Sequence, residues 1–133
     1  MLFSKGGICD GGEDGIFEGV DAIAQMFRDI WSYFRLNQHL VLNTIVEVDR
    51  VHATGHLRLV QYMITIHPEG DKAFLAVGGY DERYLKERGV WRFQHVHARV
   101  HFCCDATKGW AREPFATLLS PDAMAALGLP ITA

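Results

Sequence analysis

The sequence predicts an α+β fold in which a strongly curved antiparallel β-sheet wraps around helices and forms a cone. Three observations predict it: one amphipathic helical segment near the start, four long strand-like segments from Leu40 onward, and short turn signals between successive segments. Long strands twist, and a twisted meander curves. An aromatic helix against the concave side would leave a cone with an open end, which is a natural site for a small molecule.

We expect a single domain over residues 1–133, because 133 residues leave little room for two hydrophobic cores. The composition is that of an ordinary globular protein, with 49% hydrophobic and 22% charged residues. A net charge of −3 disfavours nucleic acid as a partner. No apolar run approaches the ~20 residues that span a bilayer, so no membrane contact is expected. The three cysteines form no disulfide framework and favour a reducing cytoplasm; they are Cys9, Cys103 and Cys104.

The N-terminal part contains the helix. The first fourteen residues are rich in glycine and are predicted to be irregular, with a turn over residues 11–15. A helix is expected after Gly19, with Asp21 in its first turn, where a negative charge suits the helix dipole. Its apolar residues recur at helical spacing, namely Ile23, Met26, Phe27, Ile30, Trp31 and Phe34. This broad aromatic stripe should lie on a large apolar surface.

The rest of the chain is predicted to be a meander followed by a tail. The expected strands cover residues 40–48, 53–66, 72–86 and 90–103. The pair Gly78-Gly79 predicts a β-bulge within the third of them. The tail over residues 105–133 carries a short helix candidate at 121–127, and it could cap the cone or reach a neighbouring subunit.

His39 is the first candidate for chemistry. It lies where the helix gives way to the first long strand, and alternation puts it on one face with Val41, Asn43 and Ile45. A histidine and an asparagine among apolar neighbours could carry out acid–base work in a pocket. The alternative is a histidine that a backbone carbonyl satisfies at the start of a strand.

A second set of polar residues lies on one face of the fourth long strand: His95, His97, Arg99 and His101. This face either meets solvent or a neighbouring subunit, or it lines a polar pocket. His-x-His is a usable zinc pair, but His97 and His101 lie about 13 Å apart at ~3.3 Å per residue and cannot share one ion. We therefore expect no metal. Tyr62, Tyr80 and Tyr84 lie in strands, where a hydroxyl could polarise a carbonyl.

Several segments resemble a known family. Residues 79–93, GYDERYLKERGVWRF, look like the Gly-x-Tyr strand and Gly-x-Trp hairpin of the SnoaL-like branch of the nuclear transport factor 2-like superfamily. Residues 17–23 resemble the start of its helix. Residues 38–43, QHLVLN, resemble the histidine-bearing strand of scytalone dehydratase, bile acid 7α-dehydratase and hexachlorocyclohexane dehydrochlorinase. The resemblance covers about residues 1–103, and it implies the cone-shaped fold of that superfamily.

The resemblance also implies a role for His39. In dehydratase-like members the corresponding histidine is a general acid or base that an Asp on an N-terminal helix orients. Met1 falls where family members approach their first strand, so the N-terminal helix is expected to be missing or shortened. Three explanations of the missing helix remain open: the true start of the chain lies further upstream, a partner subunit supplies the missing wall of the cone, or the chain has kept the pocket and lost the activity. Val77 stands where scytalone dehydratase carries a second histidine.

The resulting hypothesis is a cofactor-independent lyase or isomerase of the SnoaL-like type. His39 would transfer a proton on a hydrophobic ring substrate, and His97 is a secondary candidate if its face points inward. The expected substrate-binding residues are Asn43, Tyr62, Tyr80, His97, Phe27 and Trp31. Self-association into a dimer or trimer is expected, since such sheets usually cover their outer face with a copy of themselves. The alternative is a non-catalytic ligand-binding or assembly module on the same fold, and a weaker third option is a metal-dependent enzyme using His95 and His97.

Overall fold

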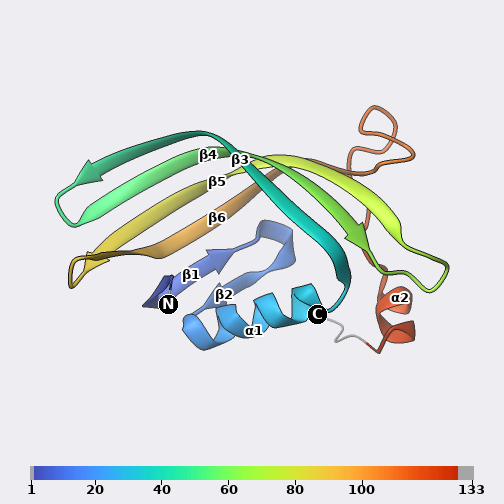
Figure 1. Ribbon diagram of the computed structural model, residues 1–133, viewed down its shortest axis with the longest axis horizontal. Helices are drawn as coiled ribbons and strands as arrows, with labels where there is room; N and C mark the ends of the chain where they lie inside the picture. Colours follow the sequence, from blue (N-terminus) through green and yellow to red (C-terminus); the bar gives the residue numbers. More distant parts are fainter. Residues whose placement is uncertain (1, 129–133) are drawn as a thin grey trace.

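A curved six-stranded sheet dominates the protein. The computed structural model describes residues 2–128, apart from the side chain of residue 13. In chain order the elements are β1 (Phe3–Asp10), the short 3-10 helix η1 (Gly12–Asp14), β2 (Ile16–Glu18), α1 (Val20–Trp31), β3 (Phe34–Asp49), β4 (His52–Thr65), β5 (Lys72–Glu87), β6 (Val90–Asp105) and α2 (Pro121–Ala126). The strand order is β2-β1-β6-β5-β4-β3. Figure 1 shows the long strands arching over α1 and α2, which lie on the concave side.

The four long strands form the predicted antiparallel meander, whereas the sheet as a whole is mixed. β3, β4, β5 and β6 pair antiparallel in succession, but β1 runs parallel to β6. The prediction of an irregular N-terminus was wrong at this point, whereas the curved α+β sheet is confirmed, with β1 added to it as a parallel strand. The segment of β1 contains only one β-branched residue, Ile8, so local propensity is weak, and pairing with the distant β6 forms the strand.

Helix α1 begins and ends at backbone features that the sequence only partly reveals. Gly19 precedes it with a φ of 84°, a conformation that glycine adopts without strain. The helix ends at Trp31, so Phe34, predicted as part of the helical stripe, instead opens β3. The carbonyl of Tyr33 accepts a hydrogen bond from the N–H of Ile66 at 2.9 Å, and this contact turns the chain into the sheet.

Alternation along β4 separates the two faces of the sheet. The buried residues are Ala53, Leu57, Leu59 and Met63. From Ala53 to Leu59, every second residue is buried and the residues in between are exposed. The buried set defines the inner face, on the concave side. Met63, Phe74 and Ala76 form a core cluster there, against which the tail packs Ala116 and Leu118.

A bulge lies at Gly78, but its extra residue is His101 on β6, and not a residue of β5 as predicted. The register between β5 and β6 shifts between Val77 and Gly78. A Cβ on Gly78 would lie 2.0 Å from the carbonyl oxygen of Arg99, and one on Gly79 would lie 2.4 Å from that of Leu57. Only glycine fits at either position, and the bulge adds to the curvature of the sheet.

Apolar side chains remain exposed at one side of the molecule. β3 is an edge strand, and its exposed apolar residues are Leu36, Leu40, Val41, Leu42, Ile45, Val46 and Val48. On α1, Phe27 and Trp31 are exposed as well. Neither helix of the described residues combines the length and apolar character that crossing a membrane requires.

Candidate functional site

His39 and Tyr80 meet on the inner face of the sheet. His39 comes from β3 and lies opposite Gln61, while Tyr80 comes from β5 and lies opposite Leu57, so both side chains project from the face that holds the buried residues of β4. The hydroxyl of Tyr80 lies 3.2 Å from Nδ1 of His39. The two rings are stacked, with their centroids 6.3 Å apart. Two residues that are 41 positions apart in the sequence therefore form one hydrogen-bonded pair.

Both members of this pair are uncharged at neutral pH. His39 is exposed by surface area, yet desolvation of its ring lowers the pKa of the imidazole. Burial raises the pKa of Tyr80 to about 12, and the charges of Cys9 and Glu82 contribute to the rise. A neutral imidazole beside a protonated phenol can accept a proton or return one, which is what general acid–base catalysis requires.

Sequence analysis pointed to the strand tyrosine Tyr84 but missed its inner-face partner, Glu82. Glu82 is buried, and the hydroxyl of Tyr84 donates a hydrogen bond to its Oε2. Burial, and next the hydrogen bond to Glu82, raise the pKa of Tyr84. Tyr80, Glu82 and Tyr84 are alternate residues of β5 and share one face. Strict alternation from Tyr80 could have identified the carboxylate.

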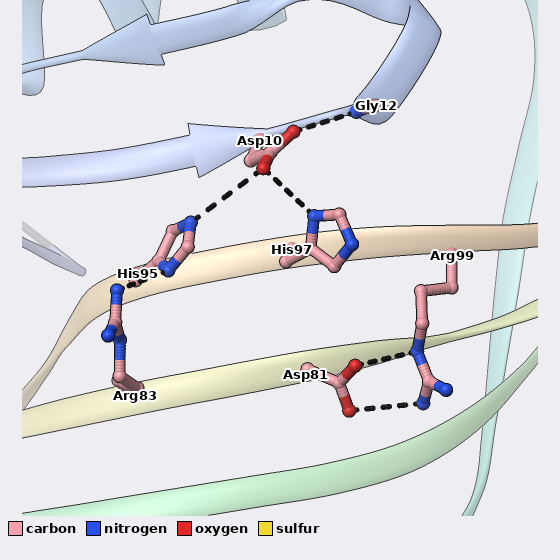
Figure 2. A network of polar contacts seen from close by, with 7 residues as sticks. All are labelled: Asp10, Gly12, Asp81, Arg83, His95, His97 and Arg99. Carbon is pink, nitrogen blue, oxygen red and sulfur yellow. Dashed lines mark hydrogen bonds and ion pairs between the residues drawn. The ribbon is translucent and has the colours of Figure 1, made fainter.

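His95, His97 and Arg99 of β6 lie on the opposite, outer face. Tyr80 pairs with Ala98, so its neighbour Asp81 pairs with His97 on the other side of the sheet. Figure 2 shows His95, His97 and Arg99 in a network with residues of β1 and β5. His97 is therefore not brought to His39.

Two carboxylates hold this network together. Oδ2 of Asp10 lies 2.9 Å from Nδ1 of His97 and 4.0 Å from Nε2 of His95 (Figure 2). Asp81 accepts from Nε of Arg99 at 2.6 Å and pairs with Nδ1 of His56 at the same distance.

The network shifts the acidity of both carboxyls. The backbone N–H of Gly12, followed by His97 and His95, lowers the pKa of Asp10. His56, followed by Arg99, lowers the pKa of Asp81. No local pattern marks Asp10 as a partner of His97, because only the parallel pairing of β1 with β6 brings them together.

No printed contact joins the other residues expected to bind substrate to the His39–Tyr80 pair. Asn43 is exposed, has a φ of 51°, and lies where the β3–β4 register shifts. Tyr62 lies opposite Leu75 and Gln38, on the outer face, and is 48% exposed. Phe27 and Trp31 are exposed on α1. Their roles in binding remain predictions.

The surface hollows of the described residues are shallow and lie elsewhere. One of about 390 Å³ is lined by residues around the β3–β4 turn, including Val48, His52 and Tyr84. Another of about 330 Å³ is lined by Phe3, Lys5, Val20, Glu87 and Arg92. Neither of these two hollows is lined by His39 or Tyr80.

Comparison with known proteins agrees with this architecture. A profile of the SnoaL-like domain matches residues 1–97. The structure is similar to that of a type-3 hexachlorocyclohexane dehydrochlorinase from Novosphingobium barchaimii LL02, with 17% identity, a TM-score of 0.70, and coverage of 78% of this chain and 71% of that one. A protein from Kribbella flavida gives 17% identity and a TM-score of 0.71, over 80% of this chain and 76% of that one.

A third similar structure, from Novosphingobium aromaticivorans DSM 12444, carries the name of a scytalone dehydratase. It gives 20% identity and a TM-score of 0.65, over 87% of this chain and 76% of that one. At these identities the likeness concerns the fold. No curated protein matches the sequence.

Proposed function

The chain belongs to the SnoaL-like family, and from this premise we propose that it is a small-molecule lyase or isomerase whose proton-transfer residue is His39. The observation that carries the proposal is the hydrogen-bonded pair of His39 and Tyr80 on the concave face. Related folds that carry the names of a dehydrochlorinase and a scytalone dehydratase support this class of reaction. The proposed substrate is a hydrophobic ring compound with a carbonyl or a leaving group.

The proposed reaction is an elimination or an isomerisation. A ring nitrogen of neutral His39 takes a proton from a carbon that a neighbouring carbonyl acidifies. The electron pair of that C–H bond forms a C=C bond as the leaving group departs, or the imidazolium returns the proton to another carbon. Tyr80 keeps its proton over the whole neutral range, because its pKa is raised to about 12, and its hydroxyl can hold either His39 or a polar atom of the substrate. This transfer needs no cofactor.

The test is a screen of ring ketones and halogenated rings for elimination or double-bond migration. We expect turnover by the wild-type protein, and a loss of at least about 100-fold in kcat for His39→Asn. His52→Asn, which changes an exposed histidine at the start of β4, is the matched control and should retain activity. Equal activity of the wild type and His39→Asn would contradict the proposal.

A non-catalytic binding or assembly module is the second candidate, and the exposure of His39 favours it. His39 is exposed, and neither hollow of the described residues contains it. A ring ligand that binds the wild type with micromolar affinity but leaves it chemically unchanged would favour this module over the enzyme.

Self-association is proposed for either candidate. The exposed apolar side chains of β3, such as Ile45 at 63% and Val48 at 62%, would be covered in a dimer or trimer. The proposed compartment is the reducing cytoplasm, since all three cysteines are unpaired thiols.

A further inference from the structure

We propose that the side-chain amides of Asn37 and Gln61 form a substrate-binding pair beside His39, which selects a ring that carries a carbonyl with an N–H or O–H next to it. The inference rests on the proposed function and deepens it, because it names the polar group that the same site would hold. Neither amide was among the candidates that the sequence suggested.

The amide pair lies on the inner face of the sheet, next to His39. Asn37 comes from β3 and lies opposite Met63, whereas Gln61 comes from β4 and lies opposite His39 itself. Directly opposed residues of an antiparallel pair have Cβ atoms about 4.5–5.5 Å apart. Asn37 and His39 are alternate residues of β3, so their side chains leave the same face about 7 Å apart. The two amides and the imidazole therefore border the same stretch of the concave side.

The two amides are joined by one hydrogen bond, which leaves donors and acceptors unused. Nε2 of Gln61 donates to Oδ1 of Asn37 at 2.7 Å, in a half-buried position. A side-chain amide has two N–H donors and a carbonyl oxygen with two lone pairs, so a single bond uses little of this capacity. Within the described part of the chain, no other group bonds to either side-chain amide. The pair thus presents both an N–H and a C=O, and this holds whichever amide is the donor.

Packing alone does not call for an amide at this place in β4. The neighbouring inner-face residues of the strand are Leu59 and Met63, which are 7% and 3% exposed. On β5, Gln61 pairs with Ala76, which is 6% exposed. An apolar side chain would pack among these residues without the cost of desolvating polar atoms. The half-buried amide keeps its unused atoms within reach of a ligand.

His39 stands between two polar groups on the concave side. Its Nδ1 lies 3.2 Å from the hydroxyl of Tyr80, which belongs to the row of Leu57, whereas Asn37 belongs to the row of Met63. A ring that lies over His39 therefore reaches the amide pair at the end away from Tyr80. There an amide N–H donates to the ring carbonyl, and an amide oxygen accepts from the adjacent N–H or O–H. A ring that lacks these groups leaves the amides unpaired, which is how a polar site rejects an apolar analogue.

The test is the binding of two probes, oxindole and N-methyloxindole, which share the fused ring and the carbonyl but differ in the N–H. Titrations followed by ¹H–¹⁵N NMR report the dissociation constants and the side-chain amide signals of Asn37 and Gln61. We expect the wild type to bind oxindole about tenfold more tightly, with shifts of both amide signals. In Gln61→Leu the two probes should bind equally. Gln38→Leu, at an exposed glutamine that faces outward from β3, is the matched control and should keep the preference.

Three results would overturn the proposal. The first is a wild type that binds both probes equally or fails to bind oxindole at millimolar concentration. The second is a folded Gln61→Leu that keeps the preference, because the bulk of the methyl group would then explain it. The third is oxindole binding that shifts neither amide signal, and this measurement decides even if Gln61→Leu does not fold.

The same probes separate this proposal from the proposed function. Binding of oxindole involves no turnover, so we expect His39→Asn to keep the preference over N-methyloxindole. The reaction is tested by the loss of turnover in His39→Asn, whereas the amide pair is tested by the ratio of the two affinities.

Discussion

Asp10 and His97, which are 87 positions apart in the sequence, are joined by a hydrogen bond of 2.9 Å between Oδ2 and Nδ1. The bond links β1 to β6 on the outer face, beside the parallel backbone pairing of the same residues. The other carboxylate oxygen of Asp10 accepts from the backbone N–H of Gly12 at 2.9 Å. One side chain therefore holds both the strand and the turn that follows it.

The first prediction concerns this anchor. Asp10→Asn keeps the shape of the side chain but removes the charge that pairs with His97. We expect a melting temperature lower by a few degrees, because the pair with His97 links β1 to β6. Thermal unfolding followed by circular dichroism measures it. Asp49→Asn, at the exposed end of β3, is the matched control and should melt with the wild type.

The second prediction is acid destabilisation. The pKa values of Asp10 and Asp81 are lowered in the folded protein, so the unfolded state binds protons first as the pH falls. Their contribution to stability is complete above the unfolded pKa of about 3.9 and is lost as the pH falls through the lower folded values. Urea unfolding between pH 7 and pH 3 should show this decline. The double variant Asp10→Asn, Asp81→Asn should show a shallower decline, and an equal decline would contradict the assignment.

The third prediction concerns the bulge. Gly78→Ala places a methyl group on the carbonyl of Arg99, and the two backbones must separate to admit it. We expect a loss of at least about 2 kcal/mol in the free energy of unfolding. Gly6→Ala is the matched control in β1, since nothing lies within 4 Å of the added atom. Chemical denaturation of the two variants should separate them clearly; a Gly78→Ala protein as stable as Gly6→Ala would show that the close approach is absent.

The fourth prediction is the pH dependence of the proposed activity. Burial lowers the pKa of His39 below its ordinary value of 6.5, so the basic form dominates at neutral pH. We expect kcat/KM to be level above that lowered pKa and to fall about tenfold per pH unit below it. Tyr80→Phe should reduce kcat by about 10-fold, the cost of one hydrogen bond to the reacting centre. A profile that falls only below pH 4 would point to a carboxylate instead of His39.

The fifth prediction is that β3 mediates self-association. Ile45→Lys puts a charge on its exposed apolar surface and should weaken a dimer or trimer at least about tenfold, or 1.4 kcal/mol. Sedimentation velocity measures the change. Val90→Lys, at a valine of similar exposure on the β5–β6 hairpin, should sediment as the wild type does. A wild type that stays monomeric at high concentration would contradict the proposal.

Much of the meander could be predicted because its signals are local. Alternation and turn residues lie within the segments that they organise, and the structure has the later three strands close to where these signals indicate. The first strand begins at Phe34, earlier than predicted, and the extra residue of the bulge lies on β6. The end of α1 was harder to predict. Phe34 continues the helical spacing, but the hydrogen bond between Ile66 and the carbonyl of Tyr33 draws the chain into β3 first.

The candidate site, too, could be predicted only in part from the sequence. His39 and Tyr80 were both identified as candidates, but their contact across the sheet depends on the register of three strands. Glu82 was overlooked because a charged residue among tyrosines suggests a solvent-facing position, whereas the strand turns it inward. Alternation separates the faces of β6 but does not say which one is concave.

The sequence by itself determined the class of fold, the four long strands and the presence of His39, because each depends on neighbouring residues. Only the tertiary structure decided that β1 joins β6 in parallel, that His97 faces outward with Asp10, and that Tyr80 meets His39. The physical reason is that side-chain alternation is a local property of a strand. The partner, the register and the direction of curvature come from contacts between segments that are far apart in the chain.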